Sequence, residues 1–144
     1  MAAPERLPVD EATAEAVGAA FKLDGFFPEF NAELCSKVFP RSGLVHYRPG
    51  EKLVQQGSTG RDLFLVLAGE VVVEFKAAHD VRLGYGSVIG EMALLADGVR
   101  TATVACVTPV FAFLLAFEDL GYILEHNPAL AEHLKSLEAA RARR

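Results

Sequence analysis

The feature that most limits the possible fold is a series of short apolar segments between Leu44 and Ala116, separated by turn residues. Each segment is too short to form a helix of several turns, and several are rich in the β-branched residues that strands favour. The expected strands cover residues 44–48, 52–56, 63–68, 71–75, 81–83, 87–89, 101–106 and 110–116. Eight or so short strands with regular turns predict a mainly β fold, an antiparallel β-roll or jelly roll.

Helical patterns are expected before these strands. Asp10 is an N-cap for a helix that runs to about Lys22, and Asn31 caps a second, short helix. The aromatic connector between them, residues 26–30, is expected to pack on the core. Residues 1–9 are expected to be frayed.

Helical patterns return after the last strand. Residues 117–126 are expected to form one helix, and Asn127 followed by Pro128 is a strong start signal for another. In that last helix Leu130, Leu134 and Leu137 follow helical spacing and form one apolar stripe.

A length of 144 residues suits a single domain with one core. We expect N-terminal helices over residues 1–41, the β-roll over 42–116 and C-terminal helices over 117–144. An irregular insertion interrupts the regular strands at residues 88–104, and such an interruption is where a functional site is expected.

This interruption has the composition of an anion site. Gly90 lets a ligand approach the backbone, and the first N–H groups of the short helix that follows have no partner within the helix. These donors and the helix dipole attract an anion, and Arg100 adds a planar fork that suits a phosphate. Glu91 repels phosphate, but its carboxylate would accept a hydrogen bond from a ligand hydroxyl. Phosphate and sugar hydroxyl together describe a nucleotide.

The same residues resemble a known motif. Gly90-Glu91-Met92-Ala93-Leu94-Leu95 followed by Arg100-Thr101-Ala102-Thr103-Val104 is similar to the phosphate-binding cassette of the cyclic nucleotide-binding domain family. That family includes the bacterial catabolite activator, regulatory subunits of cyclic-nucleotide-dependent kinases and gated channels. Further turns match in the same order, so the resemblance covers about residues 24–140: Tyr47-Arg48-Pro49-Gly50-Glu51, Gln56-Gly57 and Gly69-Glu70-Val71.

The resemblance implies a role for each residue of the site. Glu91 would accept the ribose 2′-hydroxyl, and Arg100 would pair with the exocyclic phosphate oxygens. Backbone N–H groups around Gly90, Met92, Ala93 and Thr101 would complete the phosphate cage. The apolar wall beside the base would consist of Val73, Val81, Leu83 and Ile89.

The ligand implied is a cyclic mononucleotide. Threonine directly after the arginine, as at Thr101, goes with acceptance of cyclic GMP in similar proteins, because its hydroxyl reaches the guanine amino group. Thr101 could instead bond only the phosphate, so we expect cyclic AMP with cyclic GMP tolerated.

The last helix has two interpretations. In the resembled family it folds over the bound nucleotide and moves when the ligand arrives. Alternatively it packs permanently on the barrel or pairs with a second copy, because a stripe at this spacing reports only burial.

Two other function classes stay open. The chain could be a protein-interaction adaptor with a vestigial pocket, binding a partner through Phe26-Phe27 or through the leucine stripe. It could also be an oligomeric structural subunit. An effector protein or domain is implied by the sensor interpretation but is not identified by the sequence.

Catalytic, metal-dependent and nucleic-acid-binding functions are not expected. The four histidines, His46, His79, His126 and His133, lack metal-ligand spacing, and no serine has the context of a nucleophile elbow. A net charge of −5 disfavours nucleic acid. No metal, cofactor or enzyme activity is therefore predicted beyond the nucleotide ligand.

The chain is expected to act in the cytoplasm without contact to a membrane. No apolar run approaches membrane-spanning length, and the N-terminus lacks the pattern of a signal peptide. Cys35 and Cys106 are expected to be buried thiols.

Overall fold

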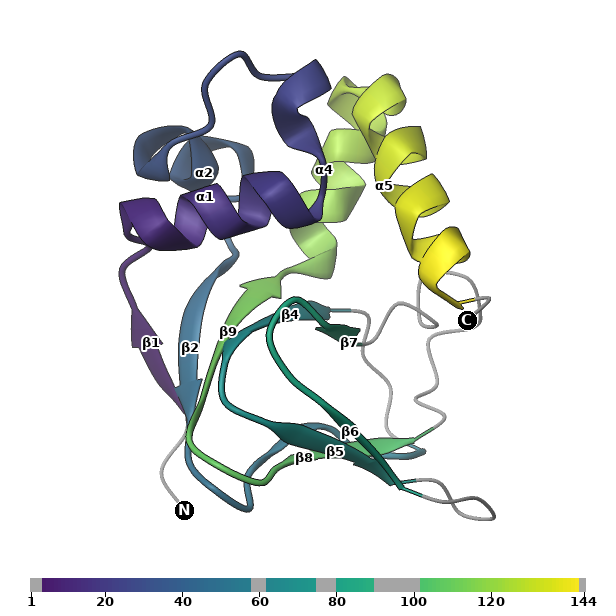
Figure 1. The fold of residues 1–144 in the computed structure, drawn as a ribbon. Coiled ribbons are helices and arrows are strands. Elements are labelled where there is room, and N and C mark those ends of the chain that lie inside the picture. Colours follow the sequence, from purple (N-terminus) through teal and green to yellow (C-terminus); the bar gives the residue numbers. More distant parts are fainter. Residues whose placement is uncertain (1–3, 58–61, 75–79, 90–101, 143–144) are drawn as a thin grey trace.

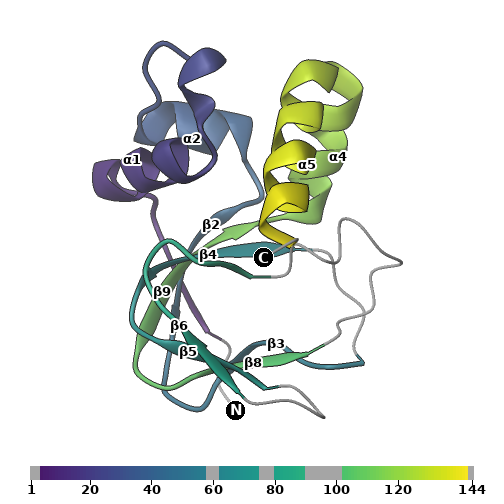
Figure 2. The same ribbon diagram turned by 45° about the vertical axis from the view of Figure 1, so that its right-hand side comes forward.

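The computed structural model describes residues 4–57, 62–74, 80–89 and 102–142. Over these ranges two antiparallel sheets face each other, and helices gather on one side of the larger sheet (Figures 1 and 2). This architecture confirms the predicted antiparallel β-roll with flanking helices. The five-stranded sheet has the order β1-β2-β9-β4-β7, and the four-stranded sheet has the order β3-β8-β5-β6.

The strands in chain order are β1 Glu5–Leu7, β2 Gly43–Tyr47, β3 Lys52–Val54, β4 Leu63–Ala68, β5 Val71–Glu74, β6 Val81–Leu83, β7 Val88–Ile89, β8 Thr103–Cys106 and β9 Val110–Leu115. The helices are α1 Glu11–Ala20, the short 3₁₀ turn η1 Leu23–Gly25, α2 Ala32–Val38, α4 Phe117–His126 and α5 Pro128–Ala142.

Three of these helices begin where local hydrogen-bonding chemistry predicts. The side chains of Asp10 and Asn31 accept the backbone N–H three residues later, at 2.7 Å and 2.8 Å. Asn127 accepts the N–H of Leu130 at 3.2 Å. Each contact satisfies one N–H that the first helical turn leaves unpaired, so these helix starts are encoded by neighbouring residues.

The expectation of a frayed N-terminus is wrong for residues 5–7. They form β1, which pairs antiparallel with β2, with Arg6 opposite Val45 and Leu7 opposite Leu44. Three residues are too few to show a strand period in the sequence. The unpaired edge of β2 supplies the hydrogen-bonding partners, and this edge exists only in the folded sheet.

Strand β4 lies between β9 and β7 in the larger sheet and is buried on both faces. Leu63 and Leu65 pack into the core beneath the helices, whereas Phe64 and Val66 pack into the core between the two sheets. A strand covered on both sides reads as a continuous apolar run, which is why the β4 sequence does not alternate with polar residues.

The helical side of the core includes the aromatic connector. Phe26, Phe27 and Phe30 are half-buried and pack against the core beneath the helices, as expected. Leu130 and Leu134 of α5 enter the same core with 1% and 2% exposure. The side chain of Leu137, the third residue of the predicted stripe, lies outside the described side chains.

The turn from β4 to β5 depends on Gly69. Its φ is 93°, a left-handed conformation that residues with a Cβ rarely adopt. A Cβ at this position would also overlap the carbonyl oxygen of Pro109, on the turn before β9. A glycine is therefore required here both by the turn and by the approach of another chain segment.

The start of α4 is held by residues that are distant in the sequence. The Asp119 carboxylate is 2% exposed and accepts the N–H of Arg41, at 3.1 Å to Oδ2, and the hydroxyl of Ser42, at 2.5 Å. The Ser42 oxygen in turn accepts the N–H of Ala116 at 2.9 Å, and Asp62 accepts the N–H of Phe117. The N-cap residue Ala116 has no side-chain acceptor, so other parts of the chain satisfy the first turn.

Burial also sets the acidity of three core groups. It raises the pKa of Cys35 and of Tyr47 to about 12, and that of Cys106 to about 11. For the latter two, the nearby Glu51 charge acts in the same direction. All three groups are therefore neutral in the folded protein near neutral pH.

We expect alkaline pH to destabilise the fold. A group whose pKa is raised by folding stabilises the native state fully below its unfolded pKa, about 9 for a thiol, and loses that contribution as pH rises towards the folded value. The free energy of unfolding, measured by urea titration, should fall by on the order of 1 kcal/mol between pH 8.5 and pH 10. A variant with both Cys35→Ala and Cys106→Ala should show a shallower fall; an identical slope would contradict the assignment.

Candidate functional site

The predicted cassette connects the two sheets. Strand β7, which precedes it, belongs to the five-stranded sheet, and β8, which follows it, belongs to the four-stranded sheet. Residues 90–101 between them lie outside the described residues. Six predicted site residues are therefore not placed: Gly90, Glu91, Met92, Ala93, Arg100 and Thr101.

Both flanks of this segment are well anchored. Ile89 is 4% exposed and pairs with Phe64 on β4, while Val88 pairs with Leu65. On the other flank, Thr103 pairs with Glu74 in register, and its hydroxyl oxygen accepts the N–H of Gln56 at 3.0 Å. The ends of the predicted cassette are thus held by backbone pairing in two different sheets.

The structure brings three of the four predicted wall residues against one apolar core. Ile89 belongs to the core between the sheets, and Val73 and Leu83 are half-buried and pack against it. Val81 lies opposite Val73 in the β5–β6 pair but is 45% exposed. Val73, Leu83 and Ile89 share an apolar environment with Val104 and Cys106 of β8, and whether they touch a base stays a prediction.

One contact near the C-terminal helices was not expected from the sequence. Nε2 of His133, on α5, lies 3.0 Å from the carbonyl oxygens of both Phe21 and Lys22. The His133 ring also packs on Phe26, with 4.9 Å between ring centroids. Lys22 has a left-handed backbone with φ of 50°, which turns its carbonyl group at the end of α1. No local pattern signals a contact between residues more than 110 positions apart.

Two kinds of feature are absent from the described part of the chain, a metal-binding cluster and a membrane-spanning helix. Within those ranges, no three histidine, cysteine or acidic side chains are grouped so that they would hold a metal ion. None of the described helices combines the length and the apolar character needed to cross a membrane.

The family follows from a comparison with known domains. Residues 44–127 match the family model of the cyclic nucleotide-binding domain. The chain belongs to the cyclic nucleotide-binding domain family. The matched range starts in β2 and ends just before α5, so it contains the strands from β2 to β9, the predicted cassette and α4, but not β1.

Curated relatives of this domain include ion channels. The chain is 33% identical over 118 residues to potassium/sodium hyperpolarization-activated cyclic nucleotide-gated channel 3 of Mus musculus, a match that covers 82% of this chain. It is 32% identical over 104 residues to the Homo sapiens protein of the same name, covering 72% of this chain. The chain spans only 15% and 13% of the lengths of these channels.

Solved structures share the fold. A cyclic nucleotide-binding domain from Methylobacillus flagellatus superposes with a TM-score of 0.75 at 23% identity, covering 97% of this chain and 84% of that one. The Thermus thermophilus catabolite activator protein superposes with a TM-score of 0.65 at 27% identity, covering 86% of this chain and 58% of that one. The chain therefore shares the fold of these domains.

Proposed function

We propose that this domain binds a cyclic mononucleotide, with cyclic AMP preferred and cyclic GMP tolerated, and acts as a regulatory module without catalytic activity of its own. The observation that carries the proposal is the family match over residues 44–127, which contains the whole of the predicted cassette. The names of the matched channels describe cyclic-nucleotide gating in those proteins. Secure anchoring of both cassette flanks is consistent with a site whose geometry must be reproducible.

Different residues of the cassette bind different parts of the nucleotide. Arg100 pairs with the exocyclic phosphate oxygens, because a guanidinium offers two parallel N–H donors to an anion. Glu91 accepts the ribose 2′-hydroxyl, a contact that a deoxyribose ligand lacks. Backbone N–H groups at Gly90, Met92 and Ala93 complete the phosphate cage.

The base occupies the apolar side of the site. Val73, Leu83 and Ile89 already pack against the core between the sheets, so a planar base would extend an existing apolar surface. The exposed Val81 side chain would lose water contact when the base binds. Thr101 sets the choice of base. Its hydroxyl forms a hydrogen bond with the guanine amino group in cyclic GMP and with the phosphate in cyclic AMP.

Direct calorimetric titration with cyclic AMP and with cyclic GMP tests the proposal. We expect saturable binding of one nucleotide per chain, tighter for cyclic AMP. 5′-AMP is the matched control, since it has the same base and sugar but an open phosphate, and it should bind much more weakly. No binding of either cyclic nucleotide would overturn the function, whereas tighter binding of cyclic GMP would overturn only the selectivity.

We further propose that nucleotide binding changes how α5 is held. In the structure α5 packs through Leu130 and Leu134 onto the helical core, and the His133 bridge joins it to the end of α1. Asn127 ends α4 and caps the start of α5, so the helical backbone is interrupted between the two helices. This interruption gives a point about which α5 can turn.

Amide hydrogen exchange checks this coupling. Saturating cyclic AMP should change the protection of residues 128–142, because a ligand that favours one position of α5 shifts the balance between its positions. His133→Leu should raise exchange in α5 even without nucleotide, since two side-chain contacts to the α1 end are lost. Tyr122→Leu, an exposed change on α4, is the control. Unchanged protection of α5 with and without nucleotide would rule the coupling out.

A further inference from the structure

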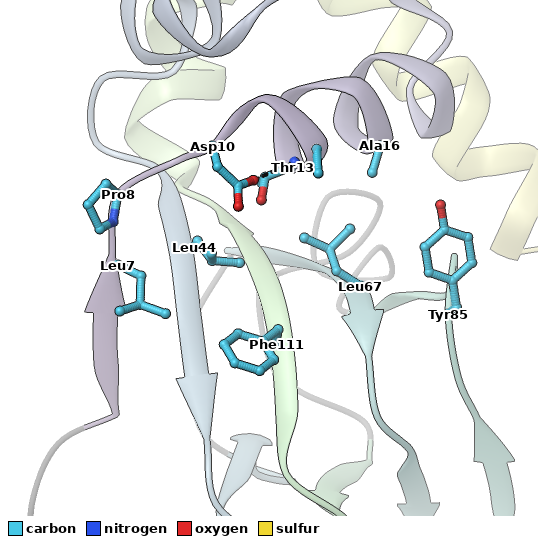
Figure 3. A pocket seen from close by; sticks show the side chains of 10 residues that line it. Leu7, Pro8, Asp10, Thr13, Ala16, Leu44, Leu67, Tyr85 and Phe111 are labelled. Atoms are coloured by element: carbon cyan, nitrogen blue, oxygen red, sulfur yellow. Dashed lines mark hydrogen bonds between the residues drawn. The ribbon is translucent and has the colours of Figure 1, made fainter.

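An apolar groove lies between α1 and the helix-facing side of the five-stranded sheet (Figure 3). Its volume is about 500 Å³. The residues lining it are mostly apolar: Leu7, Pro8, Asp10, Ala12, Thr13, Ala16, Leu44, Leu67, Tyr85 and Phe111. A second hollow of about 230 Å³ shares Ala16, Leu67 and Tyr85 with the first, so the groove continues beneath α1 towards Gly86.

The groove exists because α1 presents small side chains to this part of the sheet. Ala12 and Ala16 line its roof, and larger side chains there would fill the space. Below them, Phe111 of β9 is 37% exposed, and Tyr85 is 74% exposed. Phe111 and Tyr85 are two large side chains that stay accessible along one apolar groove, and accessible apolar surface of this kind indicates a binding surface.

The charge of the groove selects against anions. Among the described lining residues Asp10 is the only charged one, and Figure 3 shows its side chain reaching from the start of α1 towards the sheet. Hydrogen bonds from Thr13 lower the pKa of Asp10, so its carboxylate is ionised at neutral pH. Glu5 lies opposite His46, whose ring lies tilted against the Phe111 ring with 4.5 Å between their centroids. A nucleotide phosphate would be repelled here, and a lysine or arginine would be attracted.

The form of the groove favours a protein segment over an enclosed small molecule. A small-molecule pocket surrounds most of its ligand, whereas Tyr85 and Phe111 leave this groove open to water along its length. An open apolar surface with a carboxylate beside it accepts an apolar side chain and a neighbouring basic one from the same partner segment.

The groove is also connected to α5. Its roof is α1, and the carbonyl oxygens of Phe21 and Lys22, just after the end of α1, contact His133 of α5. A change in the position of α5 would therefore act directly on the helix that sets the height of the roof.

We propose that the groove beneath α1 docks a segment of an effector protein that carries an aromatic or branched apolar side chain next to a lysine or arginine. We also infer that α5 controls this docking through His133. The docking proposal depends only on the groove, whereas the control of docking by α5 rests on the function proposed above.

Two matched peptides test the docking. Blocked hexapeptides Gly-Lys-Leu-Phe-Lys-Gly and Gly-Glu-Leu-Phe-Glu-Gly have the same apolar centre and opposite charges. In ¹⁵N-resolved NMR titrations, the lysine peptide should shift the amide signals of Leu44, Leu67 and Phe111 at lower concentration than the glutamate peptide. Phe111→Ser should weaken its binding at least tenfold, since the apolar floor is lost.

A further variant isolates the charge. Asp10→Ser removes the carboxylate but keeps an N-cap side chain, so α1 should still form. It should weaken binding of the lysine peptide about two- to fivefold, the range for an accessible ion pair. Tyr122→Ser, an exposed aromatic change on α4, should have no effect. Equal binding of both peptides, or no shifts at the groove at millimolar peptide, would overturn the docking proposal.

The same titration with and without saturating cyclic AMP tests control by α5. Nucleotide should change the affinity for the lysine peptide, and His133→Leu should reduce that change. Suppose that calorimetry shows nucleotide binding and the peptide binds with the same affinity with and without nucleotide. Control of docking by α5 is then overturned, and the docking proposal survives. If cyclic AMP does not bind at all, the proposed function fails while the peptide result still decides the docking.

Discussion

Replacing Arg100 with alanine is expected to weaken cyclic AMP binding tenfold to a hundredfold. A hydrogen bond to a charged group contributes about 1.5–3 kcal/mol, and Arg100 is proposed to supply the bidentate contact to the exocyclic phosphate oxygens. Each 1.4 kcal/mol corresponds to a tenfold change in the dissociation constant. Isothermal titration calorimetry of Arg100→Ala against the unmodified protein measures the change directly.

Two further substitutions sharpen this result. Arg100→Lys keeps the positive charge but loses the planar fork, so it should recover only part of the affinity. Arg48→Ala removes an exposed arginine that pairs with Glu51 on the opposite side of a turn, and it should leave the affinity unchanged. An Arg100→Ala protein that binds cyclic AMP as tightly as the unmodified protein would show that the phosphate site is elsewhere.

The largest expected effect on stability is that of Asp119→Ala, a loss of about 3–5 kcal/mol in the free energy of unfolding. The buried carboxylate accepts hydrogen bonds from the Arg41 N–H and the Ser42 hydroxyl, and each bond to a charged group contributes about 1.5–3 kcal/mol. Without Asp119 both donors would lose their acceptor in a partly buried environment. Urea unfolding followed by circular dichroism measures the loss.

Neighbouring substitutions provide the controls. Glu118→Ala changes an exposed carboxylate in the same helical turn and should alter stability by less than about 0.5 kcal/mol. Asp119→Asn keeps one acceptor oxygen and should fall between the two. Ser42→Ala removes the link from Asp119 to the Ala116 N–H, so its effect should not add fully to that of Asp119→Ala. A loss no larger for Asp119→Ala than for Glu118→Ala would contradict the role assigned to this network.

Local signals in the sequence predicted much of the fold. Asp10, Asn31 and Asn127 each bond an N–H only three residues away, so the residues that determine these helix starts are adjacent in the chain. The strands β4 and β6 begin and end at the predicted residues, because turn residues bound them on both sides. Other strands differ from the prediction by one or two residues at their ends, where backbone pairing with a neighbour decides the last hydrogen bond.

The candidate site was proposed from the sequence for a related reason. A cassette that binds through consecutive backbone N–H groups and two side chains must have those residues at short, regular spacing. Glu91 and Arg100 therefore stand out in the sequence, and the family match covers both. The apolar wall stays a prediction, and the exposure of Val81 was not evident from the sequence, since it depends on how β6 lies at the edge of its sheet.

Contacts between distant segments had no such signal. Asp119 is a common residue type for the first turn of a helix, and only the folded chain shows that it is buried against Arg41 and Ser42. In the sequence, no pattern distinguished His133 from the other histidines. In the structure it joins α5 to the end of α1. The groove beneath α1 likewise requires β2, β4 and β9 to lie side by side.

The sequence by itself determined where α1, α2 and α5 begin, the order of the turns and the spacing of Glu91 and Arg100. Gly69 illustrates both sources of information. The sequence predicted that it lies in a turn, but only the structure shows that Pro109 approaches closely enough to exclude a side chain there. The tertiary structure alone decided the pairing of β1, the burial of Asp119, the His133 bridge and the groove. The physical reason is the distance along the chain: caps and turns are made by atoms a few residues apart. These four features instead join segments that only tertiary packing brings together.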